Sequence, residues 1–185
     1  MLRLTRPQDL SEEERVLTMN RPATQMREAT LRAASTADLT AIESLLVASG
    51  LPTAGVADAL NGFLVAESAG SKQIVGVVGV EVCCSEYALL RSTAVDPAWR
   101  GTGLGKRLVE RAIAEAESRG IRAMYLLTTT AERYFPSFGF VKATREAVPD
   151  EVKQSVEFRE ACPATATVMS LELADRSRAV PASTG

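Results

Sequence analysis

Apolar residues recur along the chain with two periods, one typical of β-strands and the other of α-helices. Strand-like runs lie at 29–34, 63–68, 73–84, 87–96, 123–130, 140–144 and 166–173. Helical spacing occurs over 36–50, is clearest over 104–120, and returns over 148–161. Strands and helices in this order predict a mixed α/β (α+β) domain, with a central sheet of about seven strands flanked by helices.

Two connections between these elements carry signals of their own. Thr129 and Glu132 have the spacing of a capping box, which predicts a further helix after the strand of residues 123–130. Pro136 keeps that helix short, because proline lacks the backbone N–H that a helix interior needs. The segment 51–62 holds one proline and two glycines around a weak helical pattern, so we expect a loop suited to act as a lid.

The two ends of the chain differ from the part between them. Residues 1–27 and 174–185 show no sustained periodicity, and the second segment is mostly small and polar. We therefore expect a flexible N-terminal extension, a domain over 28–173 and a flexible C-terminal tail. The length of 185 residues suits a single domain of this size.

The charge balance argues against a polyanionic partner. Lysine and arginine number 21 against 23 aspartate and glutamate residues, which gives a formal net charge of -2. Because nucleic-acid-binding domains usually carry a basic surface, we expect no nucleic-acid partner. No apolar run approaches the roughly 20 residues that cross a bilayer, and the first residues lack the apolar centre of a signal peptide. We expect a cytoplasmic protein without a membrane partner.

Few residue types are available for metal binding and proton transfer. The chain has no histidine, the commonest zinc ligand and general base, so we expect no metal. Three cysteines, an odd number, predict no disulfide framework. Cys83 and Cys84 raise the alternative of capturing trivalent arsenic, but neighbouring residues of a strand point to opposite faces unless the strand ends at Cys83. We expect buried, unreactive thiols, with Cys162 packed beneath the last strand.

The stretch RGTGLG at residues 100–105 predicts an anion site. It follows a predicted strand and opens the clearest predicted helix, so free backbone N–H groups and the positive end of a helix dipole meet there. A dinucleotide fingerprint fails, because Leu108 or Lys106 stands where its third glycine belongs. A P-loop fails as well, because Arg100 replaces its first glycine and Arg107 its serine or threonine.

The same stretch resembles the Arg/Gln-x-x-Gly-x-Gly/Ala turn of the GNAT acetyltransferases. TAVDPAWRGTGLGKRLVERAIAEAESRG is similar to that family's fourth strand, pyrophosphate turn and third helix, and YFPSFGFVKA to the segment before its sixth strand. The resemblance implies the GNAT fold, a sheet splayed between strands four and five, and acetyl-CoA as co-substrate. It also implies that Ala94 and Val95 offer main-chain partners to the pantetheine arm. It assigns the pyrophosphate to Arg100, Gly101, Thr102, Gly103, Leu104, Gly105 and Lys106.

Three further residues are candidates for catalysis and acceptor binding. Many GNAT enzymes carry a glutamate where Leu89 stands, so we expect Glu81, a carboxylate in an otherwise apolar strand, to act as the base. The family's general-acid tyrosine aligns with Phe135. Tyr134, one residue earlier, is therefore a candidate acid, with a packing role or water as the alternatives. Arg91 lies in an apolar strand and suits a bidentate carboxylate of the acceptor, or a structural salt bridge with Glu81.

The identity of the acceptor is predicted from resemblance. Strands like LLRSTAV occur in amino-acid N-acetyltransferases related to N-acetylglutamate synthase, and YALLRSTAVDPAWRGTGLG and YLLTTTAERYFPSFGF resemble the N-acetyltransferases of arsenic-resistance operons. These resemblances imply acetylation of the α-amino group of a small amino acid or a toxic analogue, for example a glutamate analogue containing arsenic or phosphorus. GNAT proteins are often dimers, so the resemblance allows a homodimer. Two other functions stay open: a protein N-terminal or lysine acetyltransferase, and a non-catalytic acetyl-CoA-binding regulatory module.

Overall fold

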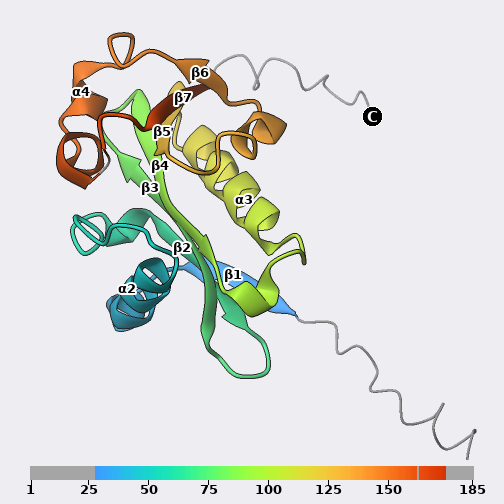
Figure 1. Ribbon diagram of the computed structural model, residues 1–185. Coiled ribbons are helices and arrows are strands. Elements are labelled where there is room, and N and C mark those ends of the chain that lie inside the picture. Colours follow the sequence, from blue (N-terminus) through green and yellow to red (C-terminus); the bar gives the residue numbers. More distant parts are fainter. Residues whose placement is uncertain (1–27, 162, 174–185) are drawn as a thin grey trace, which may run out of the picture.

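A computed structural model of the chain describes residues 28–161 and 163–173. Its centre is a seven-stranded sheet in the order β1-β2-β3-β4-β5-β7-β6 (Figure 1). The strands are β1 (Ala29–Ala33), β2 (Phe63–Ser68), β3 (Ile74–Val82), β4 (Tyr87–Val95), β5 (Ala123–Thr128), β6 (Val141–Ala143) and β7 (Thr167–Glu172). The mixed sheet confirms the predicted fold class. The predicted extension (1–27), the predicted tail (174–185) and Cys162 lie outside the described residues.

Helices cover both faces of the sheet (Figure 1). In the part of the chain that the structure describes, the α-helices are α2 (Leu39–Ala48), α3 (Leu104–Ser118) and α4 (Asp150–Lys153). Shorter turns are η1 (Thr36–Asp38), η2 (Leu60–Gly62), η3 (Pro97–Trp99), η4 (Phe135–Phe138) and the π-helical η5 (Glu157–Ala161). α3 packs on one face, while α2 and α4 pack on the other. None of the helices in the described residues has the length and apolar character that crossing a membrane requires.

α3 shows how the sequence pattern becomes packing. Its apolar residues recur at helical spacing and are buried against the sheet: Leu104, Leu108, Val109, Ala112, Ile113 and Ala116. Burying one leucine contributes roughly 1.5–3 kcal/mol, so this face holds the helix firmly on the strands beneath it. The start of α3, and with it the glycine turn, is thereby fixed relative to β4.

The sheet opens between β4 and β5. The strands β1 to β4 run antiparallel to their neighbours, whereas β4 and β5 are parallel. Their pairing covers only Tyr87↔Ala123, Ala88↔Met124 and Leu89↔Tyr125, although β4 continues to Val95. Beyond Leu89 the two strands therefore diverge, which confirms the predicted splay. The side of β4 that faces β5 is left without a neighbouring strand over its second half.

The helix predicted after residues 123–130 is wrong. The side chains of Thr129 and Glu132 form no capping box there; instead Thr128 Oγ1 accepts a hydrogen bond from the Ala131 N–H at 2.9 Å. The chain then turns and forms only η4, with Pro136 in its first positions. Aromatic rings of this segment insert into the core beneath α3, at Phe135, Phe138 and Phe140. Their packing, together with the proline, replaces a regular helix.

The single helix predicted over 148–161 is broken into α4 and η5. Ser155 Oγ accepts a hydrogen bond from the Phe158 N–H at 3.2 Å, so a new turn begins there. Glu157 in this turn forms an ion pair with Arg91 of β4. A contact with a distant strand, in addition to local helical preference, thus shapes the segment.

Candidate functional site

The glycine turn between β4 and α3 forms an open cradle. Gly101 and Gly103 have φ angles of 77° and 83°, in the left-handed region that favours glycine. A Cβ atom on either residue would meet no atom within 4 Å, so no side chain fills the space beside the turn. Gly103 is the N-cap of α3, whose first turn contains no acidic residue. The first N–H groups of the helix therefore border open space, and their binding of an anion stays a prediction.

Side chains around this turn shape a cavity of about 290 Å³. It is lined by the turn itself together with Val95, Trp99 and Tyr134. Arg100 Nε donates a hydrogen bond to the Val95 carbonyl at 3.1 Å, and Thr102 Oγ1 donates to the Trp99 carbonyl at 2.7 Å. Both hydrogen bonds hold the turn to carbonyl groups of the residues that precede it. The structure thus brings the predicted cofactor-binding residues together around one cavity, apart from Ala94, which is buried, and Thr102, whose contact is with Trp99.

A β-bulge in β4 marks the point where the sheet splays. The register with β3 changes between Val77↔Ala94 and Gly79↔Arg91, so β4 contains one residue more than β3 over this interval. Ser92 lies within the bulge with a φ angle of 54°, a left-handed conformation that is uncommon for serine. The bulge faces a second cavity of about 290 Å³ in the splay, which we call the splay cavity. It is lined by Gly50–Pro52, Leu90–Thr93, Leu126–Ala131, Phe135, Glu157 and Pro163.

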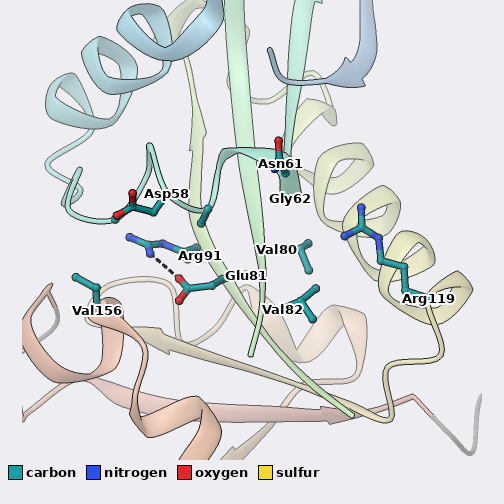
Figure 2. A pocket seen from close by; sticks show the side chains of 11 residues that line it. Asp58, Asn61, Gly62, Val80, Glu81, Val82, Arg91, Arg119 and Val156 are labelled. Carbon is teal, nitrogen blue, oxygen red and sulfur yellow. Dashed lines mark hydrogen bonds and ion pairs between the residues drawn. The ribbon is translucent and has the colours of Figure 1, made fainter. Parts of the chain in front are cut away.

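Arg91 lies at the centre of a cluster of charged groups. Its Nη1 donates a hydrogen bond to Glu81 Oε2 at 2.7 Å (Figure 2). Its Nη2 donates to the Ala54 carbonyl at 2.5 Å. The same Nη2 lies 2.8 Å from Glu157 Oε2. The Arg91 side chain is 1% exposed, whereas that of Glu81 is 21% exposed. One buried guanidinium therefore contacts two carboxylates that come from different parts of the chain.

A third cavity adjoins this cluster on the side of the segment 51–62. Its volume is about 300 Å³, and Figure 2 shows Glu81 and Arg91 pointing toward one another at its edge. Asp58 and Asn61 of the segment line it, and we call it the loop cavity. Arg91 lines both the loop cavity and the splay cavity, but Glu81 lines only the loop cavity. The predicted lid segment therefore borders both cavities. Leu51 and Pro52 at its start, together with the preceding Gly50, line the splay cavity.

Tyr134 lies apart from this cluster. Its ring packs edge-on against Phe135 and Phe138, and its side chain lines the cavity at the glycine turn. A Cβ on Gly105 would lie 3.1 Å from the Tyr134 hydroxyl oxygen. Burial, with a smaller contribution from Glu110, raises the pKa of Tyr134 above its ordinary value. The hydroxyl thus stays protonated at neutral pH, as an acid would require, but Phe135 and not Tyr134 lines the splay cavity.

Cys83 and Cys84 lie just past the end of β3, which stops at Val82. The argument that Cys83 and Cys84 point to opposite faces of a strand therefore does not apply to them. Both are free thiols. Burial, the nearby Glu81 and Cys84 raise the pKa of Cys83 to about 12, so its thiol stays protonated. A protonated thiol is a poor nucleophile, in agreement with the expectation of low reactivity for Cys83.

Known proteins resemble the chain in both sequence and structure. The sequence profile of the acetyltransferase (GNAT) domain matches residues 59–142. An amino-acid acetyltransferase of Mycobacterium tuberculosis is 30% identical over 131 residues, which cover 66% of this chain and 74% of that protein. The chain belongs to the GNAT acetyltransferase family. A crystal structure of Rv2747 from M. tuberculosis in complex with CoA and NLQ has a TM-score of 0.67 and 25% identity, covering 78% of this chain and 99% of that one.

Two further relatives match over shorter stretches of sequence, and one further structure shares the fold. An amino-acid acetyltransferase of Ralstonia nicotianae is 39% identical over 57 residues, and one of Salmonella typhimurium is 32% identical over 66 residues. These matches cover 31% and 36% of this chain, but only 13% and 15% of the two relatives. The N-acetylglutamate synthase of Neisseria gonorrhoeae, solved with coenzyme A and N-acetyl-glutamate, shares the fold with a TM-score of 0.67 at 19% identity, over 79% of this chain and 35% of that one.

Within this GNAT site, three contributors were not indicated by the sequence. Glu157 was assigned to a continuous helix, where charged residues usually face solvent. Ser92 carries the bulge, and serine gives no signal of a left-handed φ angle. The carbonyl of Ala54 reaches Arg91 from a loop 37 residues away in sequence. Only the isolated position of Arg91 in an apolar strand indicated that such anionic partners had to exist.

Proposed function

We propose that this GNAT protein transfers the acetyl group of acetyl-CoA to the α-amino group of a small amino acid or an analogue of one. The observation that carries the proposal is the buried guanidinium of Arg91, which borders the splay cavity directly beside the β4 bulge. β4 runs from this guanidinium to the glycine turn, so one strand connects the acceptor region with the donor region. The similarity to amino-acid acetyltransferases supports the same class of acceptor.

The donor half of the site fits acetyl-CoA. The open cradle at Gly101 and Gly103 suits a pyrophosphate, since backbone N–H groups at a helix start bind anions and no Cβ obstructs them. The Lys106 side chain, which is 68% exposed, adds a positive charge at the same end of α3. The resemblance assigns both Ala94 and Val95 to the pantetheine arm. The Asp96 N–H donates to the Val75 carbonyl of β3 at 2.9 Å, so Ala94, two residues earlier, also directs its main-chain groups to β3, and we infer that Val95 offers its main chain to the arm.

The acceptor half of the site fits a carboxylate. In the proposed complex the acceptor's carboxylate binds the Arg91 guanidinium from the splay cavity, and Glu81, the more exposed partner of Arg91, can turn into the loop cavity. Bidentate pairing with a guanidinium would orient the amino acid. The bulge around Ser92 interrupts the strand ladder, so a backbone N–H there is available to stabilise the oxyanion of the thioester carbonyl.

The proton transfers are assigned less directly. Glu81 as proton acceptor stays a prediction, since it lines the loop cavity rather than the splay cavity. Tyr134 as general acid also stays a prediction, since its hydroxyl lies at the glycine turn. The resemblance to arsenic-resistance N-acetyltransferases extends the proposal to glutamate analogues that contain arsenic or phosphorus.

Release of free CoA thiol from acetyl-CoA, measured across the twenty amino acids and arsenic- or phosphorus-containing glutamate analogues, tests this function. We expect release with one or a few amino acids, and a fall of about 100-fold or more in kcat/KM for Arg91→Lys, which keeps the charge but loses bidentate pairing. Release with a peptide amine alone would indicate a protein acetyltransferase. Binding of CoA without release from any acceptor would indicate a regulatory module.

A further inference from the structure

Glu157 is the carboxylate of the splay cavity. Among the described residues that line this cavity, no other aspartate or glutamate occurs. Its side chain is 8% exposed and comes from η5, so it reaches Arg91 Nη2 from a different element than Glu81, which reaches Nη1 from β3. Resting on the proposed function, we propose that Glu157 binds the ammonium group of the acceptor amino acid and accepts its proton.

The position of Glu157 relative to Arg91 matches an α-amino acid. A zwitterion carries an ammonium and a carboxylate on one carbon, and Arg91 and Glu157 present opposite charges 2.8 Å apart. When the acceptor's carboxylate binds the Arg91 guanidinium where it borders the splay cavity, its ammonium reaches Glu157, which lines the same cavity. An amine without a neighbouring carboxylate would meet only half of this pair. The two residues together therefore select α-amino acids over simple amines.

The other charged groups near Glu157 leave this role to it. Arg91 reaches it from β4, and Glu81 approaches Arg91 from β3. Arg145 is directed elsewhere, because its guanidinium stacks 4.8 Å from the centre of the Phe158 ring. The charged residues of α4, which packs beside η5, are Asp150, Glu151 and Lys153, and Lys153 pairs with Asp150 at 3.3 Å. In η5 itself Arg159 pairs with Glu160 at 3.1 Å.

The reaction balances with Glu157 as the proton acceptor. The Glu157 carboxylate takes one proton from the bound ammonium, which leaves a neutral amine with a lone pair. The amine nitrogen attacks the thioester carbonyl carbon, a C–N bond forms, and the C–S bond breaks as the oxyanion collapses. The CoA thiolate takes the second proton of the nitrogen, and Glu157 returns its proton to water when the product leaves. The products are the N-acetyl amino acid, CoA thiol and one proton.

Glu157→Gln tests the assignment, with Glu160→Gln as the matched control. Glu160 lies in the same turn, but its side chain is 62% exposed. Using the amino acid that wild-type protein acetylates best, we expect Glu157→Gln to lower kcat/KM about 100-fold near neutral pH. The loss should shrink as the pH rises toward the pKa of the free amine, because neutral amine is then supplied by solution. Glu157→Asp should restore part of the rate, and Glu160→Gln should match wild type.

Three outcomes would overturn the assignment. A Glu157→Gln variant with the wild-type rate and pH profile contradicts the role of Glu157 but leaves the proposed function intact. A loss of kcat/KM that is the same at every pH, and the same in Glu157→Asp, also contradicts this role, because that pattern indicates a structural ion pair. Changes in melting temperature and CoA affinity identify this case. An inactive wild-type protein, silent on every amino acid, contradicts the proposed function and this assignment with it.

Discussion

The proposed donor and acceptor halves of the site are built in different ways. The donor half consists of contiguous residues, 94–106, and offers mainly backbone groups held by the start of α3. The acceptor half consists of side chains from β3, β4 and η5, with a carbonyl from the loop before η2. A cradle made of backbone groups tolerates most changes of side chain at its non-glycine positions, but not a Cβ atom at its glycines. A buried charge cluster depends on every one of its side chains. The two halves should therefore fail separately and for different physical reasons.

Removing Arg91 should give the largest effect. Arg91→Ala leaves Glu81 and Glu157 without the guanidinium between them, and breaking a buried ion pair from one side costs about 3–5 kcal/mol. Denaturant unfolding should show this loss of stability, and amino-acid acetylation should disappear. CoA affinity of the folded fraction, measured by calorimetry, should change little. A stability within about 0.5 kcal/mol of wild type would show that the cluster is not a unit.

Adding a methyl group to the glycine turn should damage the donor half alone. Gly103 and Gly120 have similar φ angles of 83° and 76°, and a Cβ on either meets no atom within 4 Å. Gly103→Ala and Gly120→Ala should therefore cost a similar backbone strain of about 1–2 kcal/mol. Only Gly103→Ala should weaken CoA binding, by about tenfold or more, because its methyl group enters the anion cradle. Equal CoA affinities in the two variants would contradict the assignment of the turn.

Removing the hydroxyl of Tyr134 should give the smallest effect. The hydroxyl lies at the glycine turn, so Tyr134→Phe should change CoA affinity by at most about threefold and leave kcat nearly unchanged. Loss of a general acid instead lowers kcat about 100-fold or more. A loss of that size, with CoA affinity intact, would show that Tyr134 supplies the proton and that the turn region moves during the reaction.

The two halves also differ in how far the sequence predicts them. The turn is encoded by glycines at every second position, Gly101, Gly103 and Gly105, between a strand and an amphipathic helix, so its position and the prediction of an anionic ligand follow from local pattern. Glu157 contacts Arg91 across 66 residues of sequence, and no local period reports such a contact. The bulge at Ser92 is equally hidden, because the register of β4 is set by its pairing with β3.

The errors in secondary structure have the same origin. The capping-box spacing at Thr129 and Glu132 is a local signal, and the packing of three phenylalanine rings beneath α3 outweighs it. The helix expected over 148–161 is interrupted by the Ser155 hydroxyl and held by the ion pair to Arg91. In α3 the tertiary packing agrees with the local pattern, because the residues at helical spacing are the ones buried against the sheet, and the pattern predicted the element almost to its ends.

Direct detection of the product tests the central claim most simply. Wild-type protein is incubated with acetyl-CoA and L-glutamate, then with the other amino acids and glutamate analogues, and the products are identified by NMR. The account predicts an acetyl group on the α-nitrogen of at least one amino acid, formed in equal amount to CoA thiol. Bound CoA with no acetylated amino acid, or acetylation of peptide amines only, would contradict it.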